Sequence, residues 1–174
     1  MRFPLTVAAL VLTTVTVFAQ APYAGMQTRP IKALSEQQVA DLQAGRGMGF
    51  ALAAELNGYP GPAHVLELAD KLDLSADQRT KVQHLFASMK QEALLLGSKL
   101  IEQETELDRQ FAGHAITPVS LKSATAAIAI TQGELRETHL KYHLSTVEVL
   151  SPHQMHRYAE LRGYGGDKPM KHHH

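Results

Sequence analysis

The sequence predicts an all-α protein built around a long antiparallel helical hairpin with short flanking helices. Apolar residues recur at spacings of three and four over residues 76–111, and a second long helical stretch follows over 118–150. No segment alternates apolar and polar residues as a half-buried strand does. Because only the turn 113–117 separates the two long helices, we expect them to lie antiparallel.

The first 21 residues have the order of a secretory signal peptide. Arg2 gives a positively charged start, and residues 5–18 form an apolar run without charge. Small residues then stand where a signal peptidase cuts, either after Ala19 or after Ala21. The run is shorter than the roughly 20 apolar residues that a membrane-spanning helix needs. We therefore expect export with residues 1–21 removed, and no membrane span after cleavage.

Composition narrows the classes of function. The chain has no cysteine, which excludes disulfides, thiolate chemistry and cysteine-based zinc sites. The 17 basic and 17 acidic residues balance, so no basic surface for nucleic acid is expected. About 150 residues remain after cleavage, which fits one domain, predicted over 35–164.

The segments before the hairpin are assigned from their prolines, glycines and helix-capping residues. Residues 22–34 contain two prolines and a glycine and are predicted to be a disordered lead-in. Ser35 and Gln38 form a capping box, which starts a glycine- and alanine-rich helix reaching about Asn57. We expect its glycines to pack closely against a partner, because glycine otherwise weakens a helix.

The later elements follow from proline, glycine and the apolar pattern. A proline- and glycine-rich break ends the first helix, and a short helix is predicted over 62–71. A last short helix is predicted over 152–162, followed by a polar, disordered tail over 165–174. The apolar stripe of the first long helix comprises Val82, Phe86, Met89, Ala93, Leu96, Leu100, Leu107 and Phe111.

One helix-start signal occurs twice, at either end of the predicted hairpin, as LSADQ from residue 74 and LSPHQ from residue 150. In each copy the serine is the N-cap and the glutamine three residues later completes a capping box. The residues of the two copies are Leu74, Ser75, Gln78, Leu150, Ser151 and Gln154. The doubled signal resembles the LTxxQ motifs of the Spy/CpxP family of exported bacterial proteins, with serine in place of the commoner threonine. Members of this family are periplasmic, so the resemblance implies that the exported chain is periplasmic. The resemblance covers residues 62–164.

The resemblance implies both a shape and a function. Spy-type proteins form a thin, curved hairpin that dimerises antiparallel into a cradle, so a homodimer is expected. The family implies an ATP-independent chaperone for unfolded client proteins, or an envelope-stress adaptor acting on a membrane sensor protein. Related members bind or sense divalent metals in heavy-metal resistance, using histidines on their helices, and this is the alternative function.

His139 and His143 are the candidate metal ligands. They lie one helical turn apart, so both imidazoles share one face and can hold one ion of zinc, nickel, cobalt or copper. Leu140 follows the first histidine where a zinc protease needs glutamate, so protease chemistry is not predicted. Two histidines are fewer than the three or four ligands of an ordinary zinc site. Further ligands are expected from a second subunit or from His64, His84, His153, His156, Glu134 and Glu137.

No catalytic residues are predicted. The sequence has no cysteine nucleophile, no G-x-S-x-G elbow and no phosphate-binding P-loop, so we do not expect an enzyme. A structural envelope protein without a ligand is the third hypothesis. His172, His173 and His174 end the chain and bind metal regardless of fold, so they are left out of the predicted site.

Overall fold

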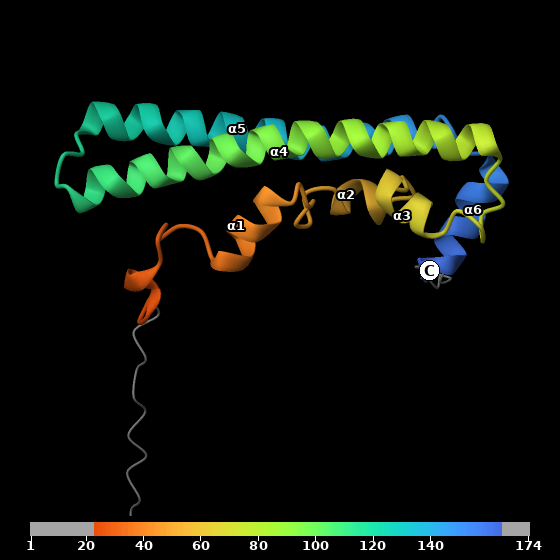
Figure 1. Ribbon diagram of the computed structural model, residues 1–174, viewed down its shortest axis with the longest axis horizontal. Helices are drawn as coiled ribbons and strands as arrows, with labels where there is room; N and C mark the ends of the chain where they lie inside the picture. The colour runs from red at the N-terminus through yellow and green to blue at the C-terminus, as the bar shows by residue number, and fades with distance from the viewer. Residues whose placement is uncertain (1–22, 165–174) are drawn as a thin grey trace, which may run out of the picture.

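The computed structural model describes residues 23–164, and this part of the chain is helical without strands (Figure 1). The predicted all-α class is therefore confirmed. The elements are a 3-10 turn at Met26–Thr28 and the helices α1 Glu36–Gln43, α2 Leu52–Glu55, α3 Pro62–Glu67, α4 Ala76–Ala112, α5 Pro118–Val147 and α6 Pro152–Leu161. The predicted signal peptide (1–21) and polar tail (165–174) lie outside the described residues.

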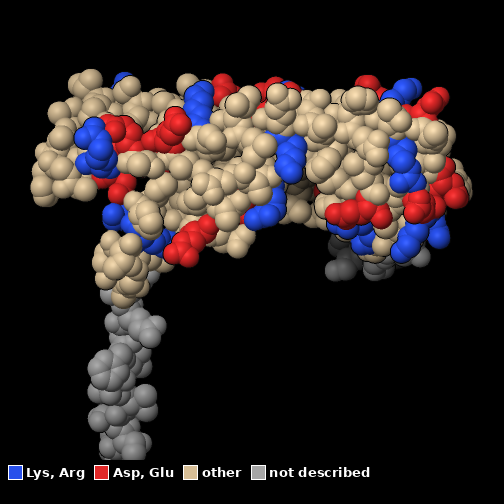
Figure 2. Space-filling view, viewed as in Figure 1, with Lys and Arg blue, Asp and Glu red and all other residues tan. Residues whose placement is uncertain are grey.

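The helices α4 and α5 lie side by side and run antiparallel, joined by a short loop (Figure 1). Each begins at a capping box, at Ser75 for α4 and at Thr117 for α5, because the N-cap side chain satisfies a backbone N–H that has no partner within the helix. Within residues 23–164 no helix is both long and apolar enough to span a membrane. On the face shown in Figure 2, acidic and basic side chains are interspersed, as the balanced charge predicts.

The segment before α4 lies along one face of the hairpin and supplies three of the seven buried residues of one core cluster (Figure 1). The predicted disordered lead-in is wrong from Ile31 onward, because Ile31 and Leu34 are buried against the hairpin. Burying two large aliphatic side chains offsets the entropy lost on ordering the chain. The residues of this core are Ile31, Leu34, Leu42, Ala93, Leu100, Ile128 and Leu135.

The single helix predicted from Ser35 to Asn57 is also wrong, because α1 ends at Gln43 and only one further turn, α2, forms before Asn57. Gly45 and Gly49 adopt positive φ angles of 65° and 83°, which glycine tolerates and which a right-handed helix cannot contain. The expected close packing does occur, but in loops. A Cβ at Gly45 would lie 3.2 Å from the carbonyl oxygen of Lys90 in α4.

The N-terminal segment approaches the hairpin closely at Gly97 of α4. A Cβ at this position would lie 2.6 Å from the backbone oxygen of Leu42, closer than real Cβ atoms come to other atoms. Both Gly97 and Leu42 are buried. The end of α1 therefore docks on a notch in α4 that only glycine provides.

The two LTxxQ-like signals meet at the end of the hairpin opposite its loop. The side-chain amides of Gln78 and Gln154 donate to each other's oxygen, at 2.9 and 3.0 Å. Each amide also donates to a backbone carbonyl, Gln78 to Val149 and Gln154 to Leu72. The two glutamines thus cap their own helices and join α4 to α6. The apolar cluster around them contains Val65, Leu72, Val82, Leu150 and Tyr158.

We predict opposite effects for two glycine substitutions in the hairpin. Gly97→Ala should lower the free energy of unfolding by about 1–3 kcal/mol, because the new methyl group meets rigid backbone. Gly133→Ala is the matched control in α5, where a Cβ meets nothing within 4 Å, and it should raise stability by about 0.5–1 kcal/mol. Urea unfolding followed by circular dichroism measures both. Equal effects of the two substitutions would contradict the predicted docking of α1 on α4.

We also predict energetic coupling between the two motif glutamines. Gln78→Ala and Gln154→Ala should each cost about 1–3 kcal/mol, since each leaves its partner amide with unsatisfied hydrogen bonds. The double variant should cost less than the sum by at least about 0.5 kcal/mol in urea unfolding. Gln38→Ala is the control, because Gln38 completes the capping box of α1 without a long-range partner. Strict additivity of the pair would show that the two motifs do not act together.

Candidate functional site

A pocket of about 260 Å³ lies between the hairpin and the N-terminal segment. Its floor is formed by α5, which contributes His139 and His143, and by Met89 of α4. Its walls are the loop 47–49, helix α2 and the first residues of α3. The pocket therefore exists only because the glycine-rich segment breaks its helix and crosses the two long helices.

His139 is buried at the floor of this pocket with one nitrogen unsatisfied. The side chain is 3% exposed, and its ring stacks on Phe50 with centroids 6.2 Å apart. Its Nε2 is buried and has no hydrogen-bond partner. Burial and the nearby His143 both lower the pKa of His139, because each disfavours the imidazolium form. The ring is therefore neutral near pH 7, and a neutral imidazole is the form that binds a metal.

His143 is oriented by the loop that precedes α3. Its Nδ1 lies 2.6 Å from the carbonyl oxygen of Tyr59. Because a carbonyl only accepts, the Nδ1 must carry the proton, which leaves a lone pair on Nε2 when the ring is neutral. The ring also packs on Gly61, where a Cβ would lie 2.7 Å from Nε2 and Cε1. Glycine at position 61 is thus required for His143 to lie where it does.

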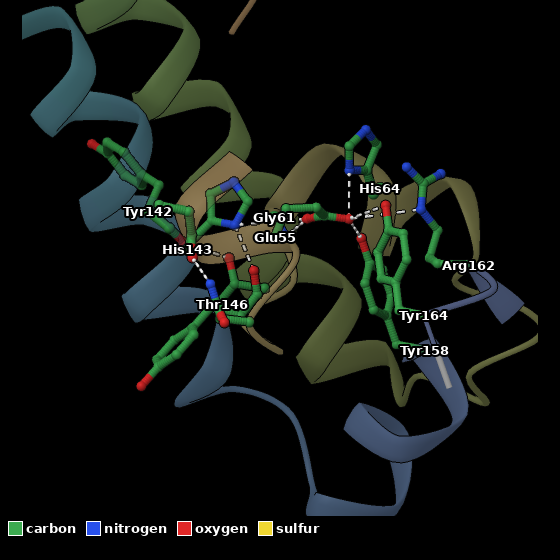
Figure 3. A network of polar contacts seen from close by, with 12 residues as sticks. Glu55, Gly61, His64, Tyr142, His143, Thr146, Tyr158, Arg162 and Tyr164 are labelled. Atoms are coloured by element: carbon green, nitrogen blue, oxygen red, sulfur yellow. Dashed lines mark hydrogen bonds and ion pairs between the residues drawn. The ribbon is translucent and has the colours of Figure 1, made fainter. Parts of the chain in front are cut away.

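Glu55 of α2 is the buried charged group beside the pocket, with 5% exposure. Hydroxyl, amide, imidazole and guanidinium groups surround its carboxylate from α3 and from the region of α6 (Figure 3). Burial alone would raise the pKa of Glu55, but hydrogen bonds from His64 and Tyr158 outweigh it and lower the pKa to about 2. The partners are Tyr158 Oη, Gly61 N at 3.2 Å, Tyr164 Oη at 3.3 Å, His64 Nδ1 at 3.3 Å and Arg162 Nε at 3.7 Å.

Glu55 also reaches the floor of the pocket, since its Oε2 lies 3.8 Å from Nδ1 of His143. Burial raises the pKa of Tyr158, as does its hydrogen bond to Glu55, so its hydroxyl remains a proton donor to the carboxylate. The carboxylate is therefore ionised and its oxygens are engaged with protein groups. It orients His143 and His64 rather than offering a free ligand.

The structure brings together some of the histidines that the sequence singled out. His139, His143 and His64 line the same pocket. His84, His153 and His156 are exposed and do not line it, and His156 lies instead 3.6 Å from Glu160. Glu134 and Glu137 also lie outside it. Between residues 23 and 164, no three or more histidine, cysteine, aspartate or glutamate side chains are grouped to hold a metal ion.

Sequence reasoning missed the carboxylate and its tyrosines. Glu55 lies in a stretch that we predicted to be one helix, and Tyr158 lies 103 residues further along the chain. The only local signal was the run from Asn57 to Pro62, which marks a break and thus a place where a loop can cover another element.

The fold and the pocket define an all-helical protein with a histidine-lined pocket between a hairpin and its own N-terminal segment. No protein-family model, curated protein or solved structure matches the chain. The residues of the pocket therefore carry the argument about function.

We predict that Glu55 makes the free energy of unfolding fall as the pH is lowered into the acid range. Its pKa of about 2 in the folded state lies below the ordinary 4.5, so its contribution is complete above pH 4.5 and is lost as pH falls toward 2. This loss amounts to something on the order of 3 kcal/mol. Glu55→Gln should lower stability at pH 7 and flatten the acid limb of the profile, measured by urea unfolding between pH 7 and 2.5.

The control for this prediction is Glu106→Gln on α4. The pKa of Glu106 is also lowered to about 2, by hydrogen bonds from Arg109 and Gln110, but the side chain is exposed. Exposed ion pairs contribute little, so this variant should keep the wild-type acid profile. A Glu55→Gln profile that parallels wild type would contradict the role of Glu55.

Proposed function

We propose that the protein binds a transition-metal ion in the periplasm, through the imidazoles of His139 and His143. One observation carries the proposal. The two histidines lie one turn apart on α5 and line one pocket, and Nε2 of His139 is buried without a hydrogen-bond partner. Buried polar atoms are nearly always paired, and a bound ion or water is a recognised reason for an exception.

The environment of His143 supports the same proposal. Histidines that bind metals usually donate their other ring N–H to a backbone carbonyl or a carboxylate, which fixes the tautomer. His143 has both groups beside its Nδ1, the carbonyl of Tyr59 at 2.6 Å and the carboxylate of Glu55 at 3.8 Å. Its Nε2 then carries the lone pair whenever the ring is neutral, and this atom lies against Gly61.

The chaperone or envelope-stress adaptor expected from the Spy/CpxP resemblance has less support. A client-binding cradle needs an open apolar face on the hairpin. In residues 23–164 the middle of the apolar stripe of α4 packs against α5 and the N-terminal segment, with Met89, Ala93 and Leu100 buried, whereas Phe111 at its end is exposed. Exported location, homodimer formation and the lack of enzymatic activity remain predictions of the sequence.

We predict that metal binding depends on the histidine pair. The test is calorimetry with Zn²⁺, Ni²⁺, Co²⁺ and Cu²⁺ on a protein in which His172, His173 and His174 are replaced by alanine. The double substitution His139→Ala with His143→Ala should weaken binding at least about tenfold, because it removes both imidazoles from the pocket.

The matched control for this experiment is His84→Ala with His153→Ala, which removes two exposed histidines outside the pocket. This control should bind as the parent does, and circular dichroism should show all variants folded. Unchanged metal affinity in the variant that lacks His139 and His143 would contradict the proposal.

A further inference from the structure

The donor atoms of the pocket point to a particular class of ion. The pocket is lined by the imidazoles of His139, His143 and His64, by the carboxylate of Glu55, and by the thioethers of Met48 and Met89. The oxygens of Glu55 already accept from two tyrosine hydroxyls and a backbone N–H. Imidazole nitrogen and thioether sulfur are therefore the donor atoms that remain for an ion at the floor of the pocket.

The two methionines reach the pocket from opposite elements. Met89 is 7% exposed on α4 and lies at the floor with the histidines. Met48 lies on the opposite wall, between Gly47 and Gly49, and is the one residue of this turn with a side chain. Its φ angle is +43°, a left-handed conformation that is uncommon for residues other than glycine and often marks a functional position.

Thioether sulfur discriminates among metals. Soft sulfur ligands favour Cu(I), whereas Mg²⁺, Ca²⁺ and Mn²⁺ favour oxygen. Zn²⁺ in proteins takes cysteine, histidine and carboxylate ligands in sets of three or four. Residues 23–164 hold no such set, so the pocket lacks the ligand group that Zn²⁺ usually takes.

The charge of the pocket favours a monovalent ion. The two thioethers contribute no charge, and a buried net charge is expensive without a counter-charge. Glu55 is the one carboxylate lining the pocket, and Arg162 already lies 3.7 Å from it. No second anion lines the pocket to balance a dication.

We propose that the ion is soft and monovalent, Cu(I) or its redox-inert analogue Ag(I), bound by His139 and His143 together with Met89 and Met48. This inference rests on the proposed function and specifies its metal. The N-terminal turn at Met48 and the hairpin then share one ion, so binding also fastens the segment to α4 and α5.

The experiment uses the full chain with His172, His173 and His174 replaced by alanine and Met170 by leucine, so that the tail supplies no ligand. Ag(I) is titrated by calorimetry, and Cu(I) is titrated anaerobically against a chromophoric chelator. Met48→Leu and Met89→Leu keep side-chain volume and the fold. Met155→Leu on α6 is the matched control, since Met155 does not line the pocket.

We expect Ag(I) and Cu(I) to bind at least tenfold more tightly than Zn²⁺. Met48→Leu with Met89→Leu should weaken Ag(I) binding at least tenfold and leave Zn²⁺ binding unchanged, while Met155→Leu changes neither. X-ray absorption of the Cu(I) protein should show sulfur neighbours that the double methionine variant lacks.

Two results overturn the inference in distinguishable ways. If the double methionine variant binds Ag(I) as the parent does, the thioether assignment is wrong, while binding of Zn²⁺ or Ni²⁺ that depends on His139 and His143 keeps the proposed function. If replacing the two histidines leaves the binding of every ion unchanged, both proposals are wrong.

Discussion

The buried carboxylate of Glu55 is the interaction on which the arrangement of this end of the molecule depends. It lies at the end of a single-turn helix that cannot be stable alone, because so short a helix has few internal hydrogen bonds. Its hydrogen bonds hold α2 against the first residues of α3 and against Tyr158 of α6. An ionised carboxylate in a buried place is tolerated only when donors surround it, and here they come from segments far apart in the sequence.

This constraint propagates to the pocket. Because Glu55 holds this loop, Gly61 packs on the ring of His143 and the carbonyl of Tyr59 lies beside its Nδ1. The turn at Gly47 packs on the ring of His139. The hairpin alone would present these imidazoles on an open helix face. The N-terminal segment encloses them, lowers the pKa of His139 through burial and adds Met48 to the wall. The pocket therefore forms only where the hairpin and the N-terminal segment meet, and neither segment forms it alone.

The structure explains why the helix-start signal occurs twice, because the glutamines of the two copies hydrogen-bond each other. Each is a capping box, and each glutamine uses its oxygen for its own N-cap and for the amide of the other copy. The pairing fixes the angle at which α6 leaves the hairpin, and so places Tyr158 near Glu55. The motif residues thus help to hold the pocket in place, although they do not line it.

The sequence by itself determined the helical class, the start of each long helix and the face that His139 shares with His143. These features are local, since capping and the 3.6-residue period act within a few residues. Only the tertiary structure decided that Ile31 and Leu34 are core residues, that the glycine-rich stretch folds as loops and that Glu55 meets Tyr158. Glycine permits a helix, a close approach or a left-handed turn, and which of these occurs depends on contacts with α4 and α5 that no local pattern encodes.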